Sequence, residues 1–222
     1  MADPVEADCS ARRPLKTRGR AWAGALGRFL ATHGVNPNGI SAAGILVAGF
    51  GATAFVLSGR NGATRGAWLL AAAACIQFRL LCNMMDGLVA VEGGRKTPTG
   101  DLWNEVPDRL EDTLLLVSAG YAVAGHPWIA ALGWAAALAA MATAYIRALG
   151  HSLGLPQDFR GPMAKPHRMA LLTGAAILAS MEPLMRIHDR IIPCALALIL
   201  AGAFWTVARR LHRASALLRS RA

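Results

Sequence analysis

The chain has 222 residues, of which 55% are hydrophobic and 16% are charged, and its formal net charge is +10. This composition is typical of a membrane protein with basic edges, and it excludes a disordered basic tail, which would be poor in apolar residues. It also argues against a nucleic-acid binder, because the basic residues are scattered between apolar blocks instead of gathering on one domain. The four cysteines show no CxxC spacing, so we expect neither a disulfide framework nor a zinc site.

The first predicted element is an amphipathic helix at about 20–34. Trp22, Leu26 and Phe29 recur at helical spacing, while basic residues lie elsewhere around the helix. This pattern is typical of a helix that lies on a membrane surface. Residues 1–19 are expected to form a flexible N-terminus, and residues 20–222 a single membrane domain that includes the interfacial helix.

Six apolar blocks follow, and each is about long enough to cross the hydrocarbon core of a bilayer as a helix. The third and the fifth are short. The blocks occupy roughly 39–58, 66–90, 109–125, 127–146, 168–185 and 191–208. We therefore predict an all-α integral membrane protein with six transmembrane helices preceded by the interfacial helix.

The distribution of Lys and Arg predicts the orientation of these spans. Eighteen of the 23 basic residues fall on one side of the predicted membrane and four on the other. Cytoplasmic segments of membrane proteins carry such an excess. Both termini are therefore expected to be cytoplasmic, and so are the connections after the second and the fourth span, in what we expect to be a bacterial inner membrane.

The acidic residues gather in one short stretch, because seven of the 13 lie between positions 86 and 112. Asn83 and Asp86 share one helical face of the second block, and Asn104 and Asp108 share a face of the helix that leads into the third. Carboxylates at a membrane edge are costly to desolvate, so such a cluster indicates function. Carboxylate and amide oxygens suit Mg²⁺ or Mn²⁺, and we predict a site for one of these ions at the cytoplasmic ends of the two helices.

At these positions the sequence resembles a known family. Asp86-Gly87-x-x-Ala90, followed by Gly100-x-x-x-Asn104-x-x-x-Asp108, is similar to the signature of the CDP-alcohol phosphatidyltransferases. That signature reads D-x-x-D-G-x-x-A-R and then G-x-x-x-D-x-x-x-D. Pro37-Asn38-x-Ile40-Ser41 before the first span is a further family feature. The resemblance extends from about residue 20 onward and implies six spans and a homodimer.

The resemblance also implies a reaction, in which a CDP-linked lipid, usually CDP-diacylglycerol, transfers its phosphatidyl group to an alcohol and releases CMP. Asp108 matches the general base of the family. The residues that match its metal ligands, or lie beside them, are Asp86, Asp108, Asn83, Asn104 and Glu105. Small residues where the cytidine would pack are Gly87, Ala90 and Gly100. If the acceptor is a phosphorylated polyol such as glycerol 3-phosphate, its phosphate is expected to bind Arg147, Lys165 and Arg168.

The chain departs from the signature at three positions. Asn83 and Asn104 replace the first and third aspartates, and Val91 replaces the arginine. One interpretation is a branch of the family with asparagine at both positions, in which Glu105 restores one charge and Arg95 or Lys96 replaces the arginine. The alternative is a non-catalytic relative that binds nucleotide-lipid or serves as an assembly partner.

Structural interpretations of the same residues stay open beside the functional ones. The two asparagines are also compatible with amides that only pack between helices, and Glu105 with an outward-facing surface group. Arg147, Lys165 and Arg168 also suit contact with lipid headgroups. Arg79 is expected to pair with Asp86, while Asp101 and Asp112 are interpreted as surface groups and left out of the site.

Overall fold

The structure is a computed structural model that describes residues 21–92 and 99–221. All regular elements in these two ranges are helical, which confirms the predicted all-α class for the described part of the chain. The helices are α1 (Ala21–Thr32), α2 (Pro37–Arg60), the short 3₁₀ helix η2 (Gly62–Thr64), α3 (Arg65–Glu92), α4 (Gly100–Gly120), α5 (Pro127–Ser152), α6 (Lys165–Ser180), α7 (Glu182–Met185) and α8 (Ile191–Arg219). The expected flexible N-terminus 1–19 lies outside the described residues.

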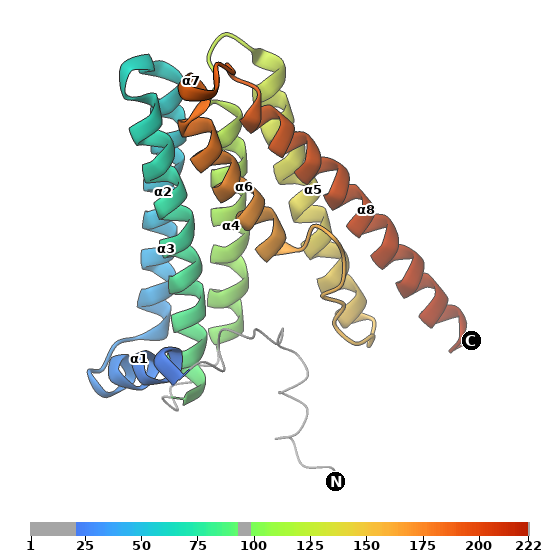
Figure 1. Cartoon of the computed structure of the whole chain (residues 1–222). Coiled ribbons are helices and arrows are strands. Elements are labelled where there is room, and N and C mark those ends of the chain that lie inside the picture. Colours follow the sequence, from blue (N-terminus) through green and yellow to red (C-terminus); the bar gives the residue numbers. More distant parts are fainter. Residues whose placement is uncertain (1–20, 93–98, 222) are drawn as a thin grey trace.

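Helix α1 lies across one end of the pair formed by α2 and α3 (Figure 1). Its Ala23 is buried against Met85 and Leu88 of α3, while Trp22 and Phe29 remain exposed. The predicted helix at 20–34 is therefore present, with one face on the protein and aromatic residues on the other. Its contact with a membrane surface stays a prediction.

Four helical segments are long and apolar enough to cross a membrane, and they make the chain an integral membrane protein. They are Pro37–Arg60, Gly62–Ala90, Pro127–Ser152 and Ile191–Arg219. Helix α4 has 21 residues, but six charged residues between 101 and 112 make its first half polar. Helix α6 has only 16 residues, against about 20 for a typical span. The membrane crossing of α4 and α6, and thus the count of six, stays a prediction.

The apolar block predicted at 168–185 is not one helix, because α6 ends at Ser180 and the short α7 begins at Glu182. The Glu182 carboxylate is buried and accepts backbone N–H groups from the turn that follows, at 3.0–3.2 Å from Asp189, Arg190 and Ile191. Arg65 pairs with the same carboxylate at 3.3 Å. Because a buried carboxylate needs such partners, the chain turns around Glu182 and does not continue α6.

Small residues allow the helices to approach closely. A Cβ added at Gly51 of α2 would lie 2.9 Å from Cys75 Cβ of α3 and 3.0 Å from Leu115 Cδ2 of α4. A Cβ added at Gly133 of α5 would lie 2.8 Å from the Leu116 carbonyl of α4. Close backbone approach of this kind is typical of helices packed in lipid. The last turns of α3 and α5 and the first turns of α2 and α4 lie at the same end of the bundle, and α6 begins partway along it (Figure 1).

Candidate functional site

The carboxylate of Asp86 is buried near the end of α3 and is held by two donors. Ser41 of α2 donates its hydroxyl to Oδ2 at 2.7 Å, and the Gly87 backbone N–H donates to Oδ1 at 2.5 Å. Charge-assisted hydrogen bonds of this length fix the direction of a carboxylate. The sequence motif before the first span includes Ser41 but does not indicate its partner. The hydrogen bond from Ser41 to Asp86 shows that α2 contributes to the group of side chains around Asp86.

Asn83 joins α3 to α4 one turn before Asp86. Its Nδ2 donates to Asp108 Oδ1 and to Glu111 Oε2, the latter at 3.0 Å. Asn83, on the face that it was predicted to share with Asp86, therefore contacts Asp108 of the second predicted face. The buried Glu111, which the predicted site does not include, contacts Asn83 as well.

Lys165, at the first position of α6, forms an ion pair with Asp108 Oδ1. Asp108 is thus the point where three helices meet, since α3 contributes Asn83 and α6 contributes Lys165. The residue expected to accept a proton and a residue expected to bind an acceptor phosphate are in direct contact.

A second layer of charge is buried next to this cluster. Arg79 is 0% exposed and donates to Glu111 Oε2 at 3.0 Å and to Asp112 Oδ1 at 2.5 Å. Arg168 donates to the other Asp112 oxygen at 2.8 Å. Two arginines in an apolar bundle require counterions, and α4 supplies both carboxylates.

This layer corrects two predictions. Arg79 does not pair with Asp86, because its side chain points to α4 while Asp86 is bound by Ser41 of α2. Asp112 is not a surface group, because it is buried between two arginines. The available signal was Arg79 itself, a lone cation in the second apolar block that needed a partner of opposite charge from another helix.

Glu105 lies on the side of α4 that faces α5. Both of its oxygens are 2.7 Å from Arg147 Nη2, and Arg109 pairs with it along the same helix. Glu105 lies outside the four candidate spans. Partial burial raises the pKa of its carboxyl, but the two guanidinium groups more than offset this and hold that pKa below the ordinary value. Arg147 also donates to Gln157 Oε1 at 2.6 Å and lies over the Phe159 ring.

Each cation expected to bind an acceptor phosphate therefore already holds one carboxylate of α4. Arg147 holds Glu105, Lys165 holds Asp108 and Arg168 holds Asp112. Arg168 is also bound to Thr143 Oγ1 at 3.3 Å and to the Met163 carbonyl at 2.9 Å. Of the three, Arg168 is the most completely enclosed by protein partners.

The remaining predicted residues flank the short stretch 93–98. Ala90 lies close to the end of α3 and Gly100 at the start of α4, while Gly87 donates to Asp86. Asn104 is half-buried and makes no side-chain hydrogen bond to the residues that the structure describes. Arg95 and Lys96, proposed as substitutes for the missing arginine, lie outside the described residues.

The oxygen atoms of this cluster suit a hard divalent cation. Glu111 Oε1 is buried without a hydrogen-bond partner among the described residues. A Cβ added at Gly44 of α2 would lie 2.6 Å from that oxygen and 3.5 Å from Asn83 Oδ1, so both acceptors face the same glycine. A buried carboxylate oxygen without a donor, such as Glu111 Oε1, is compatible with a cation as its partner. In the ranges 21–92 and 99–221, no three His, Cys, Asp or Glu side chains converge as a metal site, so amide oxygens would have to complete the ligand set.

No family model and no curated protein sequence matches the chain. Solved structures do match. The phosphatidylinositol phosphate synthase of Mycobacterium tuberculosis with CDP-DAG bound has a TM-score of 0.72 at 22% identity, over 86% of this chain and 92% of that chain. The same synthase in complex with manganese and citrate has a TM-score of 0.73 at 21% identity, over 86% and 88%. Its apo form has a TM-score of 0.69 at 22% identity, over 85% and 93%. The chain shares the fold of that synthase over most of its length.

Proposed function

We propose that the protein is a membrane transferase that moves a phosphatidyl group from a CDP-linked lipid, CDP-diacylglycerol, to an alcohol and releases CMP. The observation that carries this proposal is the cluster of Asp86, Asn83 and Asp108, formed by α2, α3, α4 and α6 at one end of the bundle. It is supported by the fold, which is shared with a synthase solved with CDP-DAG bound. The motif around Asp86 and Asp108 resembles the signature of transferases with this reaction.

In the proposed reaction the hydroxyl oxygen of the acceptor forms a bond to the phosphorus on the lipid side of the diphosphate. The bond between that phosphorus and the oxygen of CMP breaks, and CMP leaves with the bonding electrons. The hydroxyl proton passes to Asp108, which Asn83 holds in place. Transfer of this type depends mainly on positioning and on neutralisation of the phosphate charges.

The metal of this site would be Mg²⁺ or Mn²⁺. Asp86 and Asp108 would hold it, with the side-chain oxygens of Asn83, Asn104 and Glu105 as the further proposed ligands. When bound, a divalent cation neutralises the charge of the diphosphate. The synthase with the same fold was solved in complex with manganese and citrate, which supports a divalent cation here.

The acceptor is proposed to be a phosphorylated polyol such as glycerol 3-phosphate. Arg147, Lys165 and Arg168 would bind its phosphate, and Lys165 and Arg147 would exchange an α4 carboxylate for it. Gly87, Ala90 and Gly100 would leave room for the cytidine. The site is expected on the cytoplasmic side of a bacterial inner membrane, in a homodimer.

One assay tests this proposal. The purified full-length protein is incubated with CDP-diacylglycerol, Mg²⁺ or Mn²⁺, and one candidate alcohol at a time, and released CMP is measured. We expect CMP only when an acceptor is present, and loss of its release in Asp108→Asn. The matched control is Asp189→Asn, because Asp189 pairs with Arg65 near the opposite end of the bundle.

The second candidate function is a non-catalytic binder of nucleotide-lipid. It is favoured by Asn83 and Asn104, which leave two aspartates where the family signature has four. Binding of CDP-diacylglycerol without CMP release, for every acceptor and both metals, would support this candidate and contradict the transferase.

A further inference from the structure

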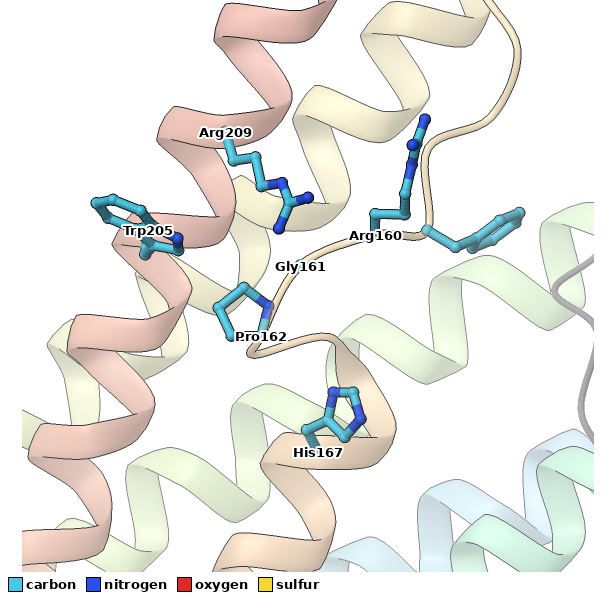
Figure 2. Close-up of a pocket in the computed structure, with 7 residues that line it drawn as sticks. Arg160, Gly161, Pro162, His167, Trp205 and Arg209 are labelled. Carbon is cyan, nitrogen blue, oxygen red and sulfur yellow. The ribbon is translucent and has the colours of Figure 1, made fainter.

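A pocket of about 510 Å³ opens beside α6 and α8. None of its lining residues belongs to the cluster of Asp86, Asn83 and Asp108, which is called the acidic cluster below. It is lined by Gly161 and Pro162 of the connecting loop and by the side chains of Phe159, Arg160, His167, Trp205 and Arg209. Figure 2 shows Arg209 extending from α8 toward this loop, with His167 on α6 beyond Pro162. His167 lies about 200° around the helix from Lys165, so α6 presents one residue to the acidic cluster and the other to the pocket.

The loop that forms one wall of the pocket is fixed on α8. The Met163 N–H donates to Thr206 Oγ1 at 3.2 Å, and Arg210 Nε donates to the Arg160 carbonyl at 3.0 Å. Gly161 has φ +140°, and a Cβ there would lie 2.8 Å from Thr206 Oγ1, so only glycine fits this contact. The pocket is therefore formed by a backbone that is already held in place.

The charge of the pocket is positive. Arg160, Arg209 and His167 line it, and none of the lining residues is acidic. Arg209 is exposed and makes no hydrogen bond or ion pair with the described residues. Arg160 meets Asp158 through Nε at 3.3 Å, and its side chain remains 59% exposed. Guanidinium groups in a concave site bind phosphate by paired N–H donors, which favours an anion with phosphate oxygens.

The pocket lies where the apolar part of α8 ends. Trp205 is 66% exposed, and the apolar block predicted at 191–208 is followed directly by Arg209. Tryptophan followed by arginine at the end of an apolar helix is typical of a membrane edge. Leu198 lies seven residues before Trp205, on the same face of α8, and is also exposed. An apolar strip thus leads along α8 to the basic pocket.

From this juxtaposition we infer that the pocket binds the phosphate of an anionic phospholipid, whose headgroup enters between Arg160, His167 and Arg209 while its acyl chains follow the strip from Trp205 to Leu198. Both parts of the site are needed for a lipid, because a free phosphate would use the cations alone. The inference does not depend on the transferase reaction, since none of the lining residues belongs to the proposed active site.

The test is native mass spectrometry of the full-length protein in a neutral detergent. The probes are phosphatidylglycerol, phosphatidylcholine and inorganic phosphate. We expect wild type to bind phosphatidylglycerol at least about tenfold more tightly than phosphatidylcholine. The double variant Arg160→Gln/Arg209→Gln is expected to bind phosphatidylglycerol about tenfold more weakly than wild type does. The matched control Arg60→Gln/Arg219→Gln removes the same charge outside the pocket and is expected to bind as wild type does.

A second measurement uses the fluorescence of Trp205. Phosphatidylglycerol with brominated chains should quench wild type more than Trp205→Phe, and this comparison holds even if the arginine variant fails to fold. Equal retention of phosphatidylglycerol by the two double variants would overturn the inference. So would competition by inorganic phosphate without preference for phosphatidylglycerol over phosphatidylcholine, or equal quenching of wild type and Trp205→Phe.

Discussion

At the scale of single residues, Asp108 connects most of the proposed chemistry, because Asn83 and Lys165 both contact it from other helices. Asp108→Asn keeps the size of the side chain and removes its capacity to accept a proton. We expect the rate of CMP release to fall about 10²- to 10⁴-fold, which is the usual contribution of a positioned general base. An unchanged rate at saturating substrate would rule out Asp108 as the base.

Replacement of Lys165 tests binding of the acceptor separately from binding of the lipid donor. If it binds the acceptor phosphate, Lys165→Gln raises KM for glycerol 3-phosphate about 10- to 100-fold and leaves KM for CDP-diacylglycerol nearly unchanged. Steady-state kinetics with each substrate varied in turn checks this. The control is Arg60→Gln, because Arg60 lies at the end of α2, at the opposite end of the bundle. An equal rise in both KM values would contradict the assigned role.

The residues that the sequence predicted best are those whose spacing on one helix determines their direction. Asn83 and Asp86 lie one turn apart, and the structure brings Asn83 to Asp108 of α4. Asp112 was misjudged because its burial depends on Arg168, which lies 56 positions away in the chain. No local pattern states which cation a carboxylate will meet across such a separation.

At the scale of helices, α4 carries carboxylates that form ion pairs with basic residues of α3, α5 and α6. Removing Asp112 would leave Arg79 and Arg168 buried without one of their counterions. We expect Asp112→Ala to destabilise the fold by about 3–5 kcal/mol, seen as a lower Tm in detergent. Glu105→Gln, at a more exposed position, should cost less than about 1 kcal/mol. Equal Tm values for these two variants would show that the buried layer does not stabilise the bundle.

Hydropathy predicted the bounds of α2 and α3 to within two residues and the beginnings of α5 and α8, but the predicted blocks end 6 residues before α5 does and 11 residues before α8 does. It began the third apolar block only at 109, although the spacing of Asn104 and Asp108 predicted a helix there, because the charged residues between Gly100 and Arg109 lower the hydropathy of the first turns of α4. It also missed the break after α6, because Glu182 acts through backbone donors that a residue pattern does not reveal.

At the scale of the whole molecule, the functional groups collect at one end of a helical bundle that has the fold of a phosphatidylinositol phosphate synthase. If that end holds a divalent cation, Mn²⁺ at about 100 times its Kd should raise the Tm by about 5–10 °C, and EDTA should reverse the shift. Asp86→Asn is expected to abolish the shift, while Asp189→Asn keeps it. A shift that is the same in both variants would place the cation elsewhere.

The most direct test of the central proposal is the stoichiometry of the transfer. The full-length protein is incubated with CDP-diacylglycerol, Mn²⁺ and an alcohol, and CMP and the phosphatidylated alcohol are quantified together. The transferase predicts equal amounts of the two products, and neither product when the alcohol is omitted or when Asp108 is replaced by Asn. Bound CDP-diacylglycerol that yields no CMP with any alcohol would contradict it, and so would CMP release that does not depend on the alcohol.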